Sequence, residues 1–166
     1  MLNIRPAVPE DVPLILQMIR ELAEYERLLP SLVVTAEDLL RDGWGPDPKF
    51  QCVIAEWSGD AAGYALFFHN YSTFRGRPGL YLEDVFVRPE FRHRGIGRAL
   101  LAHVAGVALR EGCARLEWQV LDWNAPAIEF YKCLGAQELS DWCTMRVQGA
   151  ALNALADGAP PPCSGE

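Results

Sequence analysis

A strand-like stretch runs through an arginine- and glycine-rich turn directly into a helical pattern, and this junction constrains the fold more than any other feature. Residues 79–87 are rich in strand-forming residues, whereas residues 95–109 carry one apolar stripe at helical spacing. Gly95 and Gly97 at the junction let the backbone approach a ligand closely. The free amides at the helix start, beside the arginines, suit phosphate oxygens. The glycine pair by itself does not distinguish such a phosphate site from an ordinary loop with solvated arginines.

Patterns elsewhere predict a mixed α/β fold. Residues 2–7 predict a short strand, residues 12–25 predict an amphipathic helix, and Thr35 is expected to cap a short second helix. Further elements are expected as strands at 50–56, 62–69, 79–87 and 116–121, a helix from Asn124 to Gly135, and a last strand pair over 137–147. Such a sheet is antiparallel in its first half, with helices inserted among the later strands.

The charge distribution excludes some functions and favours others. A net charge of -7 argues against non-specific nucleic-acid binding, which needs a broad basic surface. Nevertheless, the stretch from position 88 to 98 contains four arginines, and Glu90 is its only acidic residue. A basic turn on an acidic protein favours an anionic cofactor held locally and a cationic substrate drawn to the rest.

Other composition features point to a cytoplasmic protein without a metal. No run of about 18 apolar residues appears, and the first residues lack the pattern of a secretory signal, so no membrane partner is expected. The five cysteines form no CxxC pair, and the three histidines show no metal-ligand spacing. Reduced thiols and no metal site are therefore predicted.

The turn also carries a family motif. Arg92-x-x-Gly95-x-Gly97, directly after a strand, resembles the acetyl-CoA pyrophosphate motif of the GCN5-related N-acetyltransferases (GNAT). The resemblance covers roughly residues 3–150. Within the family, the chain is similar to the diamine acetyltransferase branch, which comprises the spermidine/spermine and thialysine N-acetyltransferases. The stretches that carry it are Arg5-Pro6-Ala7, Glu21-Leu22-Ala23-x-Tyr25-Glu26, Tyr81-Leu82-Glu83-Asp84, Val120-Leu121-Asp122-Trp123-Asn124 and Phe130-Tyr131-Lys132-x-x-Gly135-Ala136.

The resemblance implies a fold and an activity. A mixed, mostly antiparallel central sheet flanked by helices is expected over residues 1–154, followed by a disordered tail at 155–166. The implied reaction is direct attack on acetyl-CoA by a primary amine of a small cationic substrate, either thialysine- or lysine-like or a diamine or polyamine. Ser72 stands where polyamine enzymes carry an acidic residue, which disfavours spermidine. A homodimer is also implied.

Two residues are the catalytic candidates. An amine with a pKa of about 10.4 is protonated at neutral pH, so a base must accept its proton before attack. The resemblance assigns this role to Glu83 and the role of general acid to Tyr131; the alternatives are a surface carboxylate and a packed tyrosine. Asp84 is expected on the opposite face of the strand, in a structural or weaker binding role.

The resemblance also implies the binding residues. The backbone of Val85, Phe86 and Val87 is expected to pair with the pantetheine arm. The remaining cofactor-binding residues are Arg92, His93, Arg94, Gly95, Ile96, Gly97, Arg98, Asn124 and Tyr131. On the substrate side the candidates are Tyr25, Glu26, Glu83 and Trp118. Asn124 is equally a good N-cap, Glu26 a solvated helix end, and Trp118 a core residue.

Two other functions remain open. The first is acetylation of a peptide or protein amine, which uses the same cofactor residues but needs a more open groove. The second is a CoA-binding module without catalysis. The presence of both Glu83 and Tyr131 speaks against the second.

Overall fold

The computed structural model describes residues 1–158 of the 166-residue chain. The chain forms two compact units, Met1–Trp123 and Asn124–Glu166. The tail predicted to be disordered begins at residue 155; residues 155 and 156 end a helix in the structure, and positions from 159 on lie outside the described residues. No helix of the described part is long and apolar enough to cross a membrane.

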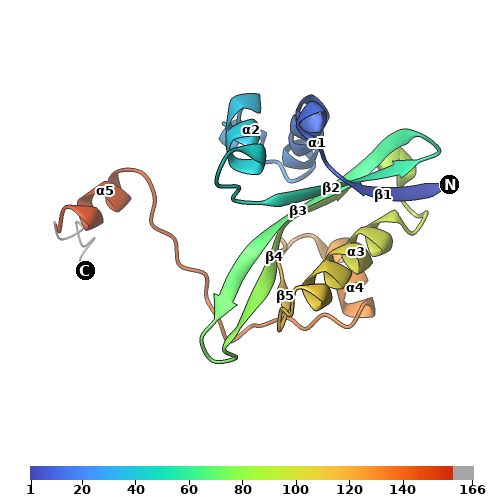
Figure 1. The fold of residues 1–166 in the computed structure, drawn as a ribbon. Coiled ribbons are helices and arrows are strands. Elements are labelled where there is room, and N and C mark those ends of the chain that lie inside the picture. Colours follow the sequence, from blue (N-terminus) through green and yellow to red (C-terminus); the bar gives the residue numbers. More distant parts are fainter. Residues whose placement is uncertain (159–166) are drawn as a thin grey trace. The chain divides into compact units, whose positions relative to one another are not determined.

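The first unit is built on a five-stranded sheet whose strands follow chain order (Figure 1). The strands are β1 (Leu2–Pro6), β2 (Gln51–Trp57), β3 (Asp60–Ser72), β4 (Arg77–Val87) and β5 (Leu116–Glu117). The first four pair antiparallel, and β5 lies parallel to β4. The predicted mixed and mostly antiparallel sheet is confirmed, although β5 is much shorter than the expected strand.

Helices cover both faces of this sheet (Figure 1). On one face lie α1 (Val12–Tyr25) and α2 (Ala36–Trp44), which share a core with the side chains of Ile54 and Tyr64. On the other face lies α3 (Ile96–Arg110), which contacts β3 and β4. Short 3-10 turns precede α1 (η1, Pro9–Asp11), follow it (η2, Leu29–Ser31) and precede α3 (η3, Pro89–Phe91). The turn between β4 and α3 therefore crosses from the sheet to its second face.

The cap predicted for the second helix is confirmed. Thr35 Oγ1 accepts a hydrogen bond from Asp38 N (3.1 Å), and the Asp38 carboxylate accepts one from Thr35 N (3.0 Å). This reciprocal pair satisfies donors that a helix start leaves free. It explains why α2 begins directly after Thr35.

The second unit contains α4 (Ala125–Cys133) and α5 (Ala150–Ala156). The strand pair expected over residues 137–147 is wrong, since no strand forms there. Strands need a ladder partner for their backbone groups, and these residues pair with no strand of the described chain. The apolar side chains of Trp142 and Met145 are 75% and 88% exposed, so this segment does not bury them as a core strand would.

Candidate active site

The register between β3 and β4 shifts at Glu83. Leu66 lies opposite Asp84 and Phe67 lies opposite Leu82, so Glu83 is an extra residue on β4 without a partner on β3. Such a β-bulge bends the strand and re-aims its side chains. The predicted base therefore lies at a local break in the ladder, where its side chain is exposed.

The bulge also changes the face on which Asp84 lies. Tyr81 pairs with Phe68 and Asp84 with Leu66, which are two residues apart on β3 and hence on one face. Glu83, the extra residue, lies between these two positions, so strict alternation does not hold across Glu83 and Asp84. The expectation that Asp84 lies on the face opposite Glu83 depends on that alternation and stays a prediction; the Asp84 carboxylate itself accepts a hydrogen bond from the Tyr64 hydroxyl.

Asp84 is a carboxyl group held in an unfavourable environment. Burial raises its pKa to about 6, and the nearby charges of Glu83 and Glu26 act in the same direction. The Tyr64 hydroxyl donates a hydrogen bond to Asp84 Oδ2 (3.0 Å), which opposes this rise. A cation placed beside these carboxylates would relieve their mutual repulsion.

A pocket of about 230 Å³ lies against this acidic cluster. Its acidic wall is formed by Asp84 and by Glu26 at the end of α1, where burial raises the pKa of the Glu26 carboxyl. The rest of the pocket is mainly apolar, lined by Ile19, Leu22, Ala23, Leu28, Ser31 and Leu32. This combination suits an alkyl chain that carries an ammonium group.

The basic turn begins with two residues in unusual backbone conformations. Gly95, the N-cap of α3, has φ +78°, and His93 has φ +62°. The left-handed region favours glycine, which explains the first glycine of the motif. No side chain caps α3, and no atom lies within 4 Å of the position that a Gly95 Cβ would take. A helix start without a side-chain cap leaves its first amides available to a phosphate group.

The arginines of the turn do different things. Arg88 is committed to structure: its guanidinium donates to both carboxylate oxygens of Glu21 (2.9 Å each) and to the Ala61 carbonyl (3.1 Å). Arg94 lies over the Trp57 ring (5.5 Å to its centroid) and, like Arg98, is exposed. From the sequence alone, Arg88 counts only as part of the basic turn, and its pair with Glu21 is missed because the two residues are far apart in the chain.

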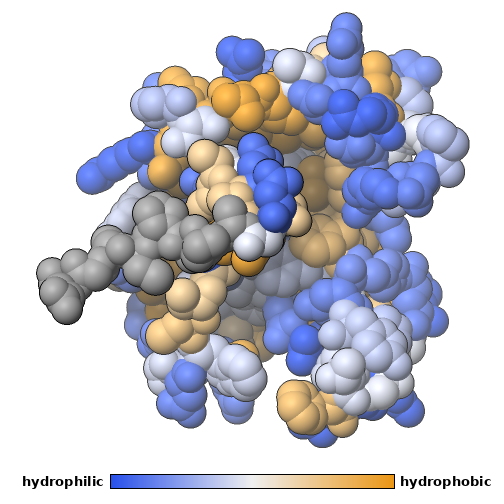
Figure 2. All heavy atoms as spheres, turned by 90° about the vertical axis from the view of Figure 1, so that its left-hand side faces the viewer, coloured by the Kyte–Doolittle hydropathy of each residue, from blue (hydrophilic) through white to orange (hydrophobic). Residues whose placement is uncertain are grey.

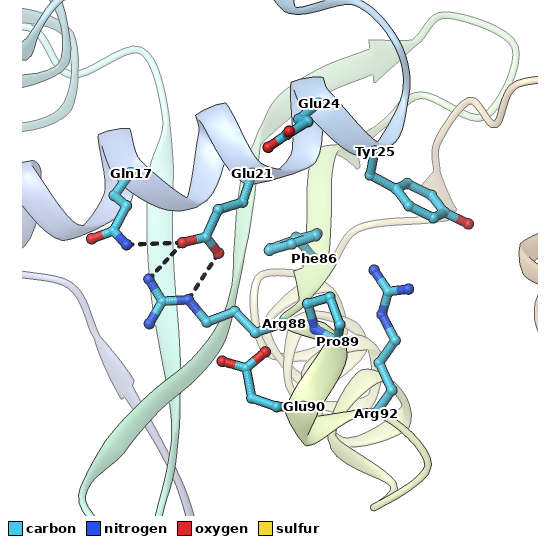
Figure 3. A pocket seen from close by; sticks show the side chains of 9 residues that line it. All are labelled: Gln17, Glu21, Glu24, Tyr25, Phe86, Arg88, Pro89, Glu90 and Arg92. Atoms are coloured by element: carbon cyan, nitrogen blue, oxygen red, sulfur yellow. Dashed lines mark hydrogen bonds and ion pairs between the residues drawn. The ribbon is translucent and has the colours of Figure 1, made fainter.

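Arg92 lines a larger pocket of about 500 Å³ between α1 and the end of β4 (Figure 3). Its guanidinium lies 4.8 Å from the Tyr25 ring centroid and 5.9 Å from that of Phe86, and its Nε donates to the Val87 carbonyl (3.0 Å). The structure thus brings Tyr25, a predicted substrate residue, together with the first residue of the glycine motif. Stacking on two rings holds the guanidinium at the rim of the basic turn.

One edge of β4 is open where the pantetheine arm is expected. Val85, Phe86 and Val87 pair with β3 on one side. On the other side, among the described residues 1–158, only Leu80 and Tyr81 of β4 pair with a strand, which is β5. The backbone groups beyond Tyr81 therefore face no strand of the described chain, and an extended ligand can pair with such an edge.

The remaining predicted residues lie apart from this cluster in the chain. Trp118 directly follows β5 and is half-buried. Asn124 and Tyr131 belong to the second unit. Asn124 is the N-cap of α4, where its Oδ1 accepts from Ala127 N (3.4 Å), and Tyr131 lies on α4 with its ring 5.5 Å from that of Phe130. The capping role of Asn124 is thus confirmed.

Comparison with known proteins agrees with this geometry. The Acetyltransferase (GNAT) family matches residues 16–136. The chain is 43% identical to a thialysine N-epsilon-acetyltransferase of Bos taurus over 92% of its length and 96% of the relative's. It is 32% identical to an L-ornithine N5-acetyltransferase of Arabidopsis thaliana, covering 92% of this chain and 87% of the other.

A solved structure shows the same fold. An integron cassette protein from the mobile metagenome of V. cholerae superposes with a TM-score of 0.78 at 24% identity, over 93% of this chain and 97% of that one. The family match, the two relatives and the shared fold confirm the resemblance seen in the glycine motif. The chain belongs to the GNAT family of acetyltransferases and is an acetyl-CoA-dependent N-acetyltransferase.

Proposed function

We propose that this enzyme acetylates the terminal primary amine of a small cationic amino acid of the thialysine, ornithine or lysine type. The observation that carries the proposal is the acidic cluster of Glu26, Glu83 and Asp84 beside a pocket of about 230 Å³. An ammonium group lowers the energy of the three neighbouring carboxylates, whereas a neutral or anionic substrate does not. The names of the two curated relatives point to the same class of substrate.

Acetyl-CoA supplies the thioester that the amine attacks. The free amides at the start of α3 and the exposed Arg94 and Arg98 would hold its diphosphate, and the open edge of β4 at Val85–Val87 would pair with the pantetheine arm. The open space at Gly95 and the uncapped helix start fit a phosphate group. Arg92 would fix the position of the turn through its two aromatic contacts.

Two side chains would move protons. The Glu83 carboxylate accepts the proton of the bound ammonium, directly or through water, and so produces the free amine that attacks. The Tyr131 hydroxyl donates a proton to the departing thiolate, because a phenol with a pKa of about 10 is still protonated at neutral pH. Glu83 stands at the bulge of β4 and Tyr131 on α4.

An amine panel tests the substrate class. The purified enzyme with acetyl-CoA is assayed by thiol release with thialysine, ornithine, lysine, spermidine and a lysine-containing peptide. We expect kcat/KM to be highest for the amino acids and at least tenfold lower for the peptide, since the pocket is small. Activity confined to the peptide would contradict the proposal and favour a protein-modifying enzyme.

The variant Asp84→Asn tests the acidic pocket itself. It removes a charge but keeps the acceptor for Tyr64, so KM for the amine should rise while KM for acetyl-CoA stays the same. In the native enzyme, KM for the amine should rise as the pH falls below about 6, where Asp84 becomes protonated and neutral. Asp60→Asn, at the exposed β2–β3 turn, is the matched control. An unchanged KM for the amine in Asp84→Asn would exclude this pocket as the ammonium site.

A further inference from the structure

Three potential metal ligands meet on the surface of the first unit, away from the acidic pocket. His69 on β3 places its Nε2 2.6 Å from Glu111 Oε2. Cys113 completes the group, and the ligand atoms of all three residues lie within 4.8 Å of one another. His69 lies 42 positions before Glu111, so no metal-ligand spacing appears in the sequence. The fold alone brings the group together.

The end of α3 fixes two of the three residues. Glu111 is the C-cap of α3, and Gly112, with φ +70°, turns the chain directly after it. Cys113 N donates to the Ala108 carbonyl (2.8 Å) and Gly112 N to the Leu109 carbonyl (3.2 Å), the two hydrogen bonds of a Schellman motif. Glu111 and Cys113 are therefore held on a rigid turn that faces β3.

We propose that His69, Glu111 and Cys113 bind one zinc ion, with water as the fourth ligand. An imidazole nitrogen, a carboxylate oxygen and a thiolate sulfur are the ligand types that zinc takes in proteins, and three protein ligands plus water make an open tetrahedral site. The carboxylate and the thiolate neutralise both charges of the ion. A cation at the C-terminus of α3 is also favoured by the helix dipole.

Only small side-chain movements are needed to close the site. Ligand atoms of a tetrahedral zinc site lie roughly 3.3 to 3.8 Å apart. The histidine and glutamate atoms must therefore separate slightly, and no pair needs to approach by more than roughly 1 to 1.5 Å. His69 and Glu111 are exposed and can change rotamer freely, while Cys113 is half-buried. The thiol proton of Cys113 passes to solvent when the metal binds.

The site is separate from the phosphate-binding turn. That turn precedes α3, whereas Glu111 follows it, and the 15 residues of α3 span roughly 22 Å. A bound ion would tie β3 to the connection between α3 and β5. It should raise the stability of the folded protein without changing kcat for acetylation.

Cobalt and zinc titrations of the full chain test this inference. The background protein carries Cys133→Ser, Cys143→Ser and Cys163→Ser, so that Cys113 and buried Cys52 are its remaining thiols. After removal of metal with a chelator, Co²⁺ is added and thiolate-to-cobalt charge-transfer absorption is recorded, followed by displacement with Zn²⁺. We expect one ion per chain, and Zn²⁺ should raise the Tm of this protein.

Variants separate the proposed ligands from other groups. Cys113→Ser should abolish the charge-transfer band, and His69→Gln and Glu111→Gln should each weaken zinc binding at least tenfold, in a competition assay against a chromophoric chelator. His103→Gln, a histidine elsewhere on α3, should bind like the background protein. Absence of the band in the background protein, or a band that persists in Cys113→Ser, would overturn the proposal. The first of these outcomes does not depend on how well the variants fold.

Discussion

Replacing Glu83 by glutamine should lower kcat for amine acetylation roughly 10²- to 10⁴-fold at neutral pH. Glutamine keeps the size of the side chain but cannot accept the ammonium proton. The exposed position of Glu83 at the bulge means that the substitution removes no packing. Binding of CoA should be unchanged, because the phosphate-binding turn is not altered.

The pH profile separates a base from a residue that only binds substrate. As the pH approaches the amine's own pKa of about 10.4, free amine becomes abundant and the defect of Glu83→Gln should shrink. Glu10→Gln, an exposed glutamate of η1, is the matched control and should behave like the native enzyme. A defect of equal size at every pH would show that Glu83 does not act as the base.

Replacing Tyr131 by phenylalanine should have the second largest effect, a fall in kcat of roughly 10²-fold or more. The change removes only the hydroxyl, so α4 and the ring contact with Phe130 are expected to persist. Without a proton donor, the thiolate leaves as an anion, and the barrier for its departure rises. KM for the amine and for acetyl-CoA should stay close to their native values. Steady-state kinetics across the pH range measures this.

The control for Tyr131→Phe is Tyr71→Phe, on an exposed tyrosine of β3 that is 63% accessible. That variant should keep full activity. Circular dichroism on both variants checks that each is folded. An acetylation rate for Tyr131→Phe equal to the native rate across the pH range would remove Tyr131 from the mechanism.

Local signals in the sequence predicted most elements of the first unit. The apolar spacing of residues 12–25 and 95–109 anticipated α1 and α3 closely, because both helices bury one stripe against the sheet. Thr35 followed by Asp38 marked the start of α2, and the hairpin of β2 and β3 followed from alternation around a turn. Each of these features depends on residues close together in the chain.

Features that depend on distant partners could not be predicted. The bulge at Glu83 exists only in the register between β3 and β4, so simple alternation along β4 could not give the relative orientation of Glu83 and Asp84. In the sequence Arg88 counts among the arginines of the basic turn, whereas in the structure it pairs with Glu21, 67 residues away. The strand pair expected at 137–147 finds no ladder partner in the described chain.

In the proposed mechanism, the turn from Arg92 to Gly97 holds the diphosphate of coenzyme A. Isothermal titration calorimetry with coenzyme A, and with pantetheine as the matched ligand that lacks the diphosphate, tests this most directly. We expect one coenzyme A per chain and at least tenfold weaker binding of pantetheine. No heat of binding with coenzyme A, or equal affinity for the two ligands, would show that this turn does not hold the diphosphate.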